Sequence, residues 1–267
     1  MKIISLVPSI TETLIDFSLT NQQIIGRTKF CIHPKNIVQN IKIVGGTKTL
    51  HLDTIKALEP DLIIANKEEN TKEQIEILKE SFPVMVTNIG NIEDNYYFLK
   101  NLGQLLHQDE KAKIYNSKTY EVLLENKIHY QPKVAYLIWK NPWMTIGGDT
   151  FIHDVLQNLG FQNIFASQKR YPIIQLEDLH DVDIIMLSSE PFPFKEKHIQ
   201  EFKKAYPNKM IILVDGENFS WFGTRISKSA SYFQHLKYQK EQKREAFNYF
   251  DAIVGGGDGI LYETAGA

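Results

Sequence analysis

Apolar residues along this chain gather in short continuous runs, separated by longer segments with helical spacing. The runs cover residues 2–7, 62–65, 133–139, 183–187 and 210–214. A short apolar run without polar alternation is typical of a strand that is covered on both faces. Strands of this kind that alternate with helical segments predict parallel β-α-β units, so we expect an α/β fold.

The strand-and-helix pattern occurs twice, on either side of a helical region. Between residues 95 and 127 the chain has no proline and a single glycine, Gly103, and its leucines recur at helical spacing. This region predicts two helices that break near residues 107–109. The second helix, from about residue 109 to 125, would connect the two halves as a stiff strut.

The expected architecture is therefore two Rossmann-like α/β lobes joined by a long rigid α-helix, with a ligand cleft between the lobes. The expected division is an N-terminal lobe at residues 1–106, a connecting helix at 107–130, a C-terminal lobe at 131–240 and a tail at 241–267. In open α/β sheets ligands bind outside the carboxyl ends of the strands. The segments that follow the strands, such as residues 8–12 and 141–148, are thus candidate ligand contacts.

The composition excludes some classes of function and bears on the cellular location of the protein. The formal net charge is −2 and no long basic stripe is present, which gives no footprint for nucleic acid. Cys31 is the sole cysteine, so an internal disulfide is excluded. The first apolar run ends at Val7, before Pro8, which is too short for a secretory signal. We expect a cytoplasmic monomer; the alternative is a periplasmic or membrane-associated protein whose signal was removed.

Sequence motifs for catalysis and metal binding are missing. The chain has no Gly-x-Ser-x-Gly elbow, Walker loop or zinc-protease motif, and its histidines form no His-x-x-x-His pair. Gly255–Gly259 suggests a phosphate loop but lacks the Lys-Ser/Thr that should follow. We expect no enzyme, no metal site in the protein itself and no intrinsic cofactor. A corrin or porphyrin metal could still take an axial histidine, for which His33 is nearest to a predicted strand end.

Several segments resemble one protein family. The most specific are Ser-x-x-Pro-Ser-x-Thr-Glu at residues 5–12 and Leu-x-x-Ile-x-x-Leu-x-Pro-Asp-Leu-Ile-Ile at 52–64, and further matches lie at 70–78, 146–165 and 220–225. The chain is similar, over roughly residues 2–238, to class III or helical-backbone substrate-binding proteins of ABC transporters. That family binds vitamin B12, iron siderophores or haem. The resemblance implies two lobes with little hinge motion, a ligand held between them, and an ABC permease as partner.

Candidate ligand contacts combine strand-end position with this resemblance. A flat aromatic side chain can stack on a planar ligand, and free N–H groups at a helix start favour an anion or a carbonyl. The candidates are Pro8, Ser9, Phe30, Lys48, Asn66, Trp143, Trp221, Phe222 and Arg225. We prefer Trp143 to Trp139 for the cleft. Alternatives stay open: Ser9 with Glu12 has the spacing of a capping box, Trp221 could pack within its own lobe, and Arg225 could anchor the last loop to a helix end.

Some candidate residues follow from the resemblance alone. In the family a carboxylate on each lobe docks against arginines of the permease, which points to Glu69 or Glu73 in the first lobe and Glu190 in the second. The alternative is that these are ordinary solvated carboxylates. Where vitamin B12-binding members have an aromatic residue, this chain has Asn66, followed by Lys67, Glu68 and Glu69. The first-lobe side of the ligand site should therefore be more polar than in those members.

The expected function is to bind a metal chelate between the lobes. We place a corrinoid, with its cobalt, first and an iron siderophore or haem second, held by aromatic stacking, apolar burial and a few helix-end hydrogen bonds. The protein would be the substrate-binding component of an uptake system or a carrier in corrinoid handling. A cytoplasmic enzyme or accessory protein of cofactor assembly on the same fold is the rival hypothesis.

Overall fold

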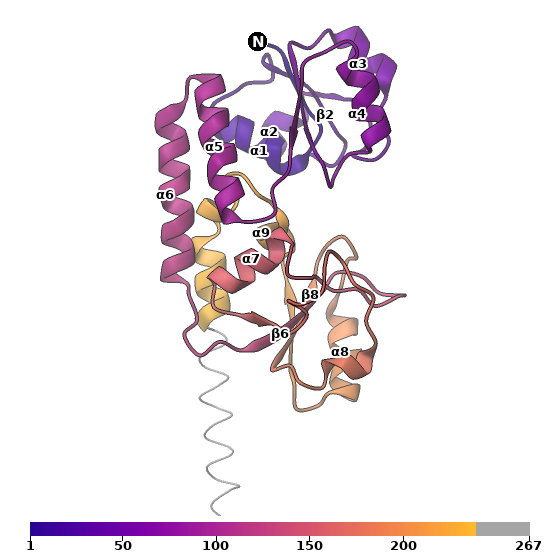
Figure 1. Cartoon of the computed structure of the whole chain (residues 1–267), viewed down its shortest axis with the longest axis vertical. Coiled ribbons are helices and arrows are strands. Elements are labelled where there is room, and N and C mark those ends of the chain that lie inside the picture. Colours follow the sequence, from indigo (N-terminus) through magenta and orange to yellow (C-terminus); the bar gives the residue numbers. More distant parts are fainter. Residues whose placement is uncertain (239–267) are drawn as a thin grey trace, which may run out of the picture.

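The computed structural model of the chain describes residues 1–238. Within this range two parallel sheets form the centres of two lobes, stacked along the long axis of the molecule (Figure 1). The predicted two-lobed α/β fold is confirmed. The expected tail at residues 241–267, with its glycine run, lies outside the described residues.

The first lobe is built on a five-stranded sheet with the order β3-β2-β1-β4-β5. Its elements are β1 (Ile3–Ser5), α1 (Pro8–Asp16), β2 (Ile24–Arg27), α2 (Lys35–Val38), β3 (Lys42–Ile43), α3 (Leu52–Leu58), β4 (Leu62–Asn66), α4 (Lys72–Lys79) and β5 (Val84–Thr87). All neighbouring strands are parallel.

The second lobe is built on a four-stranded parallel sheet with the order β7-β6-β8-β9. Its elements are β6 (Lys133–Leu137), α7 (Phe151–Asn158), β7 (Gln162–Asn163), the 3-10 helix η1 (Leu176–Leu179), β8 (Ile184–Ser188), α8 (Glu196–Ala205), β9 (Met210–Val214), α9 (Glu217–Ser220) and the 3-10 helix η2 (Ile226–Lys228). Residues 230–238 are helical as well.

Burial explains why the apolar runs form strands. Every residue of β4 and β8 is buried, and successive side chains of a strand point to opposite faces of the sheet. In β4, Leu62 and Ile64 face the main core, whereas Ile63 and Ala65 pack with Ile55 and other side chains of α3 and α4. Helices α3 and α4 cover one face of the first sheet and α1 covers the other (Figure 1).

Two antiparallel helices, α5 (Ile92–Leu106) and α6 (Asp109–Glu125), run along the side of both lobes (Figure 1). The break falls at His107, whose φ of 54° is left-handed, so both the break and the bounds of the second helix agree with the prediction. Near its start α6 reaches the first lobe, where Tyr115 stacks on Phe17 at 5.9 Å. At its end Glu125 accepts a hydrogen bond from Lys237. One apolar core continues through both helices into both lobes, which makes the connection stiff.

The segment 221–225 fastens the end of the second lobe to the first. Asn95 of α5 holds the backbone of Gly223 from both sides, accepting from its N–H at 2.5 Å and donating to its carbonyl at 3.1 Å. Gly223 has a φ of +83°, and a Cβ there would lie 2.0 Å from the hydroxyl of Thr13 in α1. Glycine is therefore required at this crossing.

The contact between α5 and α6 gives a test of the strut. A Cβ on Gly103 would lie 2.6 Å from the Cβ of Ala112, so the two helices meet there without room for a side chain. We expect Gly103→Val to lower the free energy of unfolding by about 1–3 kcal/mol, because overpacking forces the helices apart. Urea unfolding measures it. Gln104→Val, at the exposed neighbouring position, is the control, and equal losses in the two variants would contradict the close packing.

Candidate functional site

The carboxyl ends of the two sheets face each other, and side chains that follow the strands bridge the lobes at two places. After β9, Glu217 meets His33, which follows β2. After β7, Tyr171 meets Glu68, which follows β4. We call the residues that follow the strands at these facing ends of the two sheets the inter-lobe site. It includes Pro8 after β1, Glu69 after β4, Trp139 after β6 and Glu190 after β8.

The first contact, which we call the inner bridge, is a network of charged side chains. It joins Glu12, Asp16 and His33 of the first lobe to Glu217, Arg225 and Lys228. Arg225 lies 3.0 Å from both Glu12 and Glu217, and Lys228 lies 2.8 Å from Glu12. The Glu12 side chain is 7% exposed, so its charge needs these partners.

Trp221 lies inside the inner bridge. The guanidinium carbon of Arg225 sits 4.5 Å from the centre of its ring, and His33 meets it edge-on at 5.6 Å. The indole is buried. Trp221 was predicted to contact the ligand, with packing within its own lobe as the alternative, and in the structure it packs between Arg225 and His33. Arg225 was also predicted to contact the ligand. In the structure its guanidinium group is paired with the carboxylates of Glu12 and Glu217.

The second contact, which we call the outer bridge, is formed by Glu68, Arg170 and Tyr171. The Tyr171 hydroxyl donates to one carboxylate oxygen of Glu68 at 2.9 Å, and the Arg170 guanidinium pairs with the other. The side chain of Arg170 is 49% exposed. Burial and the neighbouring Glu68 carboxylate raise the pKa of Tyr171, so its hydroxyl remains a donor at neutral pH. No periodic pattern marks these residues in the sequence, because they meet only when both lobes are placed.

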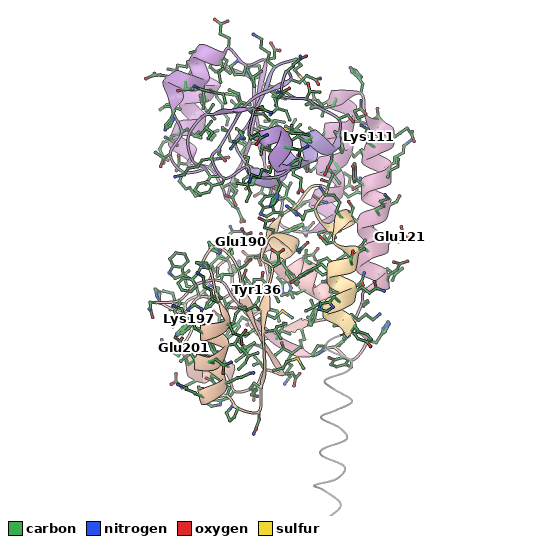
Figure 2. The ribbon with its side chains drawn as sticks, turned by 180° about the vertical axis from the view of Figure 1, so that it is seen from behind. Lys111, Glu121, Tyr136, Glu190, Lys197 and Glu201 are labelled. Atoms are coloured by element: carbon green, nitrogen blue, oxygen red, sulfur yellow. The ribbon has the colours of Figure 1, made fainter. Side chains whose placement is uncertain are left out.

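Between the bridges lie carboxylates from both lobes. Burial raises the pKa of Glu69, and Glu68 adds to this effect while Lys48 opposes it. Burial also raises the pKa of Glu190; a hydrogen bond from Ser220 at 2.7 Å opposes the shift, and Glu217, Asp215 and Glu69 reinforce it. Glu190 lies at the edge of the second lobe that faces the first (Figure 2).

The exposed aromatic residues of the inter-lobe site are not all those expected. Phe30, at 49% exposed, carries the ammonium group of Lys29 over its ring. Trp139, at 39% exposed, packs edge-on against Phe192. Trp143 instead is partly buried: it stacks on Phe194, meets Phe202 at 5.1 Å and packs against the core of the second lobe. Trp139 is the more exposed of the two tryptophans, so the structure favours Trp139 over the preferred Trp143 as a ligand contact.

Phe222 is also corrected from ligand contact to core residue. It is buried and meets Phe98 of α5 at 5.8 Å and Phe151 of α7 at 6.3 Å.

The polar candidates of the first lobe are engaged in local structure. Val7, not Ser9, is the N-cap of α1, and Glu12 binds Arg225 and Lys228 instead of closing a capping box. Pro8 takes the first helical position, where its missing N–H has no cost.

Asn66 was expected to line the ligand wall. It is buried; its side chain accepts from the N–H of Glu68 at 2.8 Å and donates to Thr87 at 3.1 Å. Lys48 is exposed and donates to the carbonyl of Glu68. Both residues therefore shape the loop that carries Glu68 and Glu69.

The carboxylates assigned to docking fall into two groups. Glu69 and Glu190 are half-buried in the inter-lobe site, where a membrane partner would have poor access. Glu73 is exposed on the first turn of α4. Glu73 is therefore the most accessible of the three, and docking through any of them stays a prediction.

The described residues contain neither a membrane-spanning helix nor a cluster of metal ligands. Within residues 1–238, no helix is both long and apolar enough to cross a bilayer. In the same range, no three or more His, Cys, Asp or Glu residues are grouped so that they could hold a metal ion. Hollows of about 300 and 310 Å³ lie against α6 and not between the lobes.

Comparison with known proteins identifies the family of the chain. A family model described as periplasmic binding protein matches residues 3–210. The chain belongs to this family. A vitamin B12-binding protein of Vibrio campbellii is 26% identical over 187 residues, which cover 67% of this chain and 66% of that protein.

Solved structures agree on the fold. A possible iron-binding, periplasmic solute-binding protein from Staphylococcus epidermidis superposes with a TM-score of 0.74 at 24% identity, covering 88% of this chain and 96% of that one. The periplasmic haem-binding protein HutB of Vibrio cholerae gives a TM-score of 0.74 at 20% identity, covering 89% and 99%. The expectation of a cytoplasmic location is wrong, because the family and these neighbours are periplasmic binding proteins.

The inner bridge predicts a large effect of removing one charge. Arg225→Ala leaves Glu12 with Lys228 alone in a buried place, so we expect the free energy of unfolding to fall by about 3 kcal/mol. Lys79→Ala breaks an exposed ion pair with Glu76 and should leave stability unchanged within error. Urea unfolding of both variants measures the difference, and a small loss for Arg225→Ala would mean that the buried charge is hydrated.

The raised pKa of Glu190 predicts a pH dependence. In the window above the ordinary glutamate pKa the folded state binds more protons than the unfolded state, so stability falls as pH rises through the pKa of folded Glu190. Glu190→Gln should remove this part of the slope and raise stability at neutral pH. Glu121→Gln, on the outer side of α6 (Figure 2), is the control. Unfolding curves between pH 4 and pH 8 give the answer, and an unchanged slope would contradict the burial of Glu190.

Proposed function

We propose that the chain is the substrate-binding component of an ABC importer and holds a metal chelate in the inter-lobe site. The observation that carries the proposal is that two sheets present their carboxyl ends to each other, with strand-end side chains of both lobes in between. Fold and family support a binding protein and not an enzyme. The relatives support a metal chelate as the ligand class, since they are named as a vitamin B12-binding protein, a haem-binding protein and a possible iron-binding protein.

Within that class the side chains favour a corrinoid over haem. Glu69 and Glu190 contribute carboxylates from opposite lobes, while Arg170 and Arg225 are already paired with Glu68 and with Glu12 and Glu217. The propionate groups of haem would face these carboxylates, and the two arginines are not free to pair with them. The exposed lysines of the first-lobe loops, Lys29 and Lys48, contact the Phe30 ring and the Glu68 carbonyl. The amide side chains on the ring of a corrinoid are neutral and meet no such repulsion.

The aromatic residues would supply the stacking surface. Phe30 of the first lobe and Trp139 of the second are both exposed at strand ends, and Ile173 is 61% exposed beside Met144, which pairs with Trp139. Apolar side chains with few rotatable bonds suit a large, partly planar ligand. We propose these as ligand contacts, together with Pro8 at the start of α1.

Delivery to a permease is the second half of the proposal. Of the three carboxylates considered, Glu73 has the exposure that docking to arginines requires. The protein would act as a monomer, with each lobe touching one side of the permease.

Titration with cyanocobalamin, cobinamide and haem tests the ligand. We expect quenching of tryptophan fluorescence by the corrinoids at micromolar concentration and weaker quenching by haem. Quenching by haem alone would favour the haem alternative. No response to any of them, nor to a ferric siderophore, would remove the proposal.

The two tryptophans of the second lobe separate ligand contact from packing. Trp139→Ala should weaken corrinoid binding by about tenfold, because loss of a stacked ring costs roughly 1.4 kcal/mol, with little loss of stability. Trp143→Ala should lower the free energy of unfolding by about 2–4 kcal/mol through lost core packing, with affinity retained in the folded fraction. Calorimetric titration and urea unfolding of both variants decide, and the reverse pattern would restore Trp143 as the contact.

A further inference from the structure

The two inter-lobe bridges differ in how firmly they are held. In the inner bridge the central Glu12 and Arg225 side chains are 7% and 16% exposed, although His33 and Lys228 at its margin are 40% and 36% exposed. The segment 221–225 is also fixed to α1 and α5 beside it. In the outer bridge Glu68 and Arg170 are 30% and 49% exposed. Exposed ion pairs are weak and buried ones are costly to break. A force that separates the lobes therefore opens the outer bridge first.

The outer bridge is also built with backbone strain on one side. Arg170 has a φ of 59°, in the left-handed region that non-glycine residues rarely adopt. Its N–H donates to Asp149 at 2.5 Å and its carbonyl accepts from Gly147 at 2.7 Å, which hold it in this conformation. Strained residues of this kind persist where the surroundings determine them, often at clamps and switches. Here the conformation presents Arg170 and Tyr171 to Glu68 across the lobe boundary.

On the first lobe, hydrogen bonds hold the loop that carries Glu68 and Glu69. Asn66 accepts from the N–H groups of Glu68 and Glu69, and Lys48 donates to the Glu68 carbonyl. Glu68 is thus held at the boundary, and Glu69 next to it faces the inter-lobe site. The oxygens of Glu68 and Tyr171 are 2.9 Å apart, so the lobes touch and no chelate ring can pass between them.

We propose that Glu68, Arg170 and Tyr171 form a latch that is closed in this structure and has to open before a large ligand enters the inter-lobe site. The inner bridge and the α5–α6 pair form the fixed side. The regulatory role rests on the proposed function, but the opening itself does not. Closing the latch lowers the population of the binding-competent state and so lowers apparent affinity in proportion.

The variants remove the latch from either lobe. Glu68→Ala deletes the shared carboxylate, and Tyr171→Phe removes one hydrogen bond while keeping the ring. Glu76→Ala, which breaks the exposed Glu76–Lys79 ion pair on α4, is the matched control. Should Glu68→Ala disturb its loop, Tyr171→Phe still tests the same contact from the other lobe.

The first measurement needs no ligand. Spin labels on Lys72→Cys and Lys197→Cys report the distance between α4 and α8, both positions being exposed (Figure 2 shows Lys197). The native Cys31 is buried and should remain unlabelled. Pulsed dipolar spectroscopy should show a longer or broader distance distribution in Glu68→Ala and Tyr171→Phe than in the parent and in Glu76→Ala. Identical distributions in all four proteins would overturn the latch.

The second measurement follows cyanocobalamin binding by stopped-flow fluorescence. Both latch variants should associate faster and bind about two- to fivefold more tightly, the gain expected when an exposed ion pair no longer opposes the open state. Unchanged or slower association, with cyanocobalamin bound, would overturn the gating role. If the parent binds none of the chelates tested, the proposed function fails, and the label distances still decide whether the latch opens.

Discussion

The Glu12 carboxylate is buried on the first helix, and the cations that neutralise it come from the far end of the chain. An unpaired carboxylate in that place would cost several kcal/mol, so Arg225 and Lys228 have to lie against α1. Once they do, the segment 221–225 is carried into the first lobe, where Asn95 and Thr13 leave room for nothing larger than glycine at position 223. The orientation of the two sheets follows from this one electrostatic requirement and from the continuous core through α5 and α6.

Because the inner bridge is more deeply buried than the outer bridge, the lobes should separate on the side of the outer bridge. The inner bridge, with Trp221 packed between Arg225 and His33, shields Glu12 and Arg225 from water, while His33 and Lys228 are 40% and 36% exposed. Glu68 and Arg170 remain partly hydrated, so their attraction is modest and reversible. Between them the site combines exposed rings with half-buried carboxylates. Such a site should bind a ligand with a broad neutral surface better than an anionic ligand. The reason is the cost of removing water from like charges, in addition to the shape of the site.

Much of the fold was predictable because it rests on local signals. The apolar runs became strands buried on both faces, and the region from residue 95 to 127 became two helices that break at His107, as the lack of proline and the leucine spacing indicated. The candidate site fared less well. Ser9 and Glu12 have the spacing of a capping box, but Glu12 gains more from Arg225 and Lys228 than from a backbone N–H. Trp139 and Trp143 flank the same turn, and no sequence pattern tells which of them faces Phe194 and Phe202.

The sequence by itself determined which segments are strands and helices, that the sheets are parallel, and that ligand-binding side chains follow the strands. These features depend on burial periodicity and on connection length, which are properties of neighbouring residues. The tertiary structure alone decided how Glu68 meets Tyr171, why Arg225 is occupied, and why Glu69 and Glu190 face inward. Those outcomes depend on pairs more than 100 residues apart, or on burial created by the opposite lobe. Spacing along the chain carries no information about such contacts.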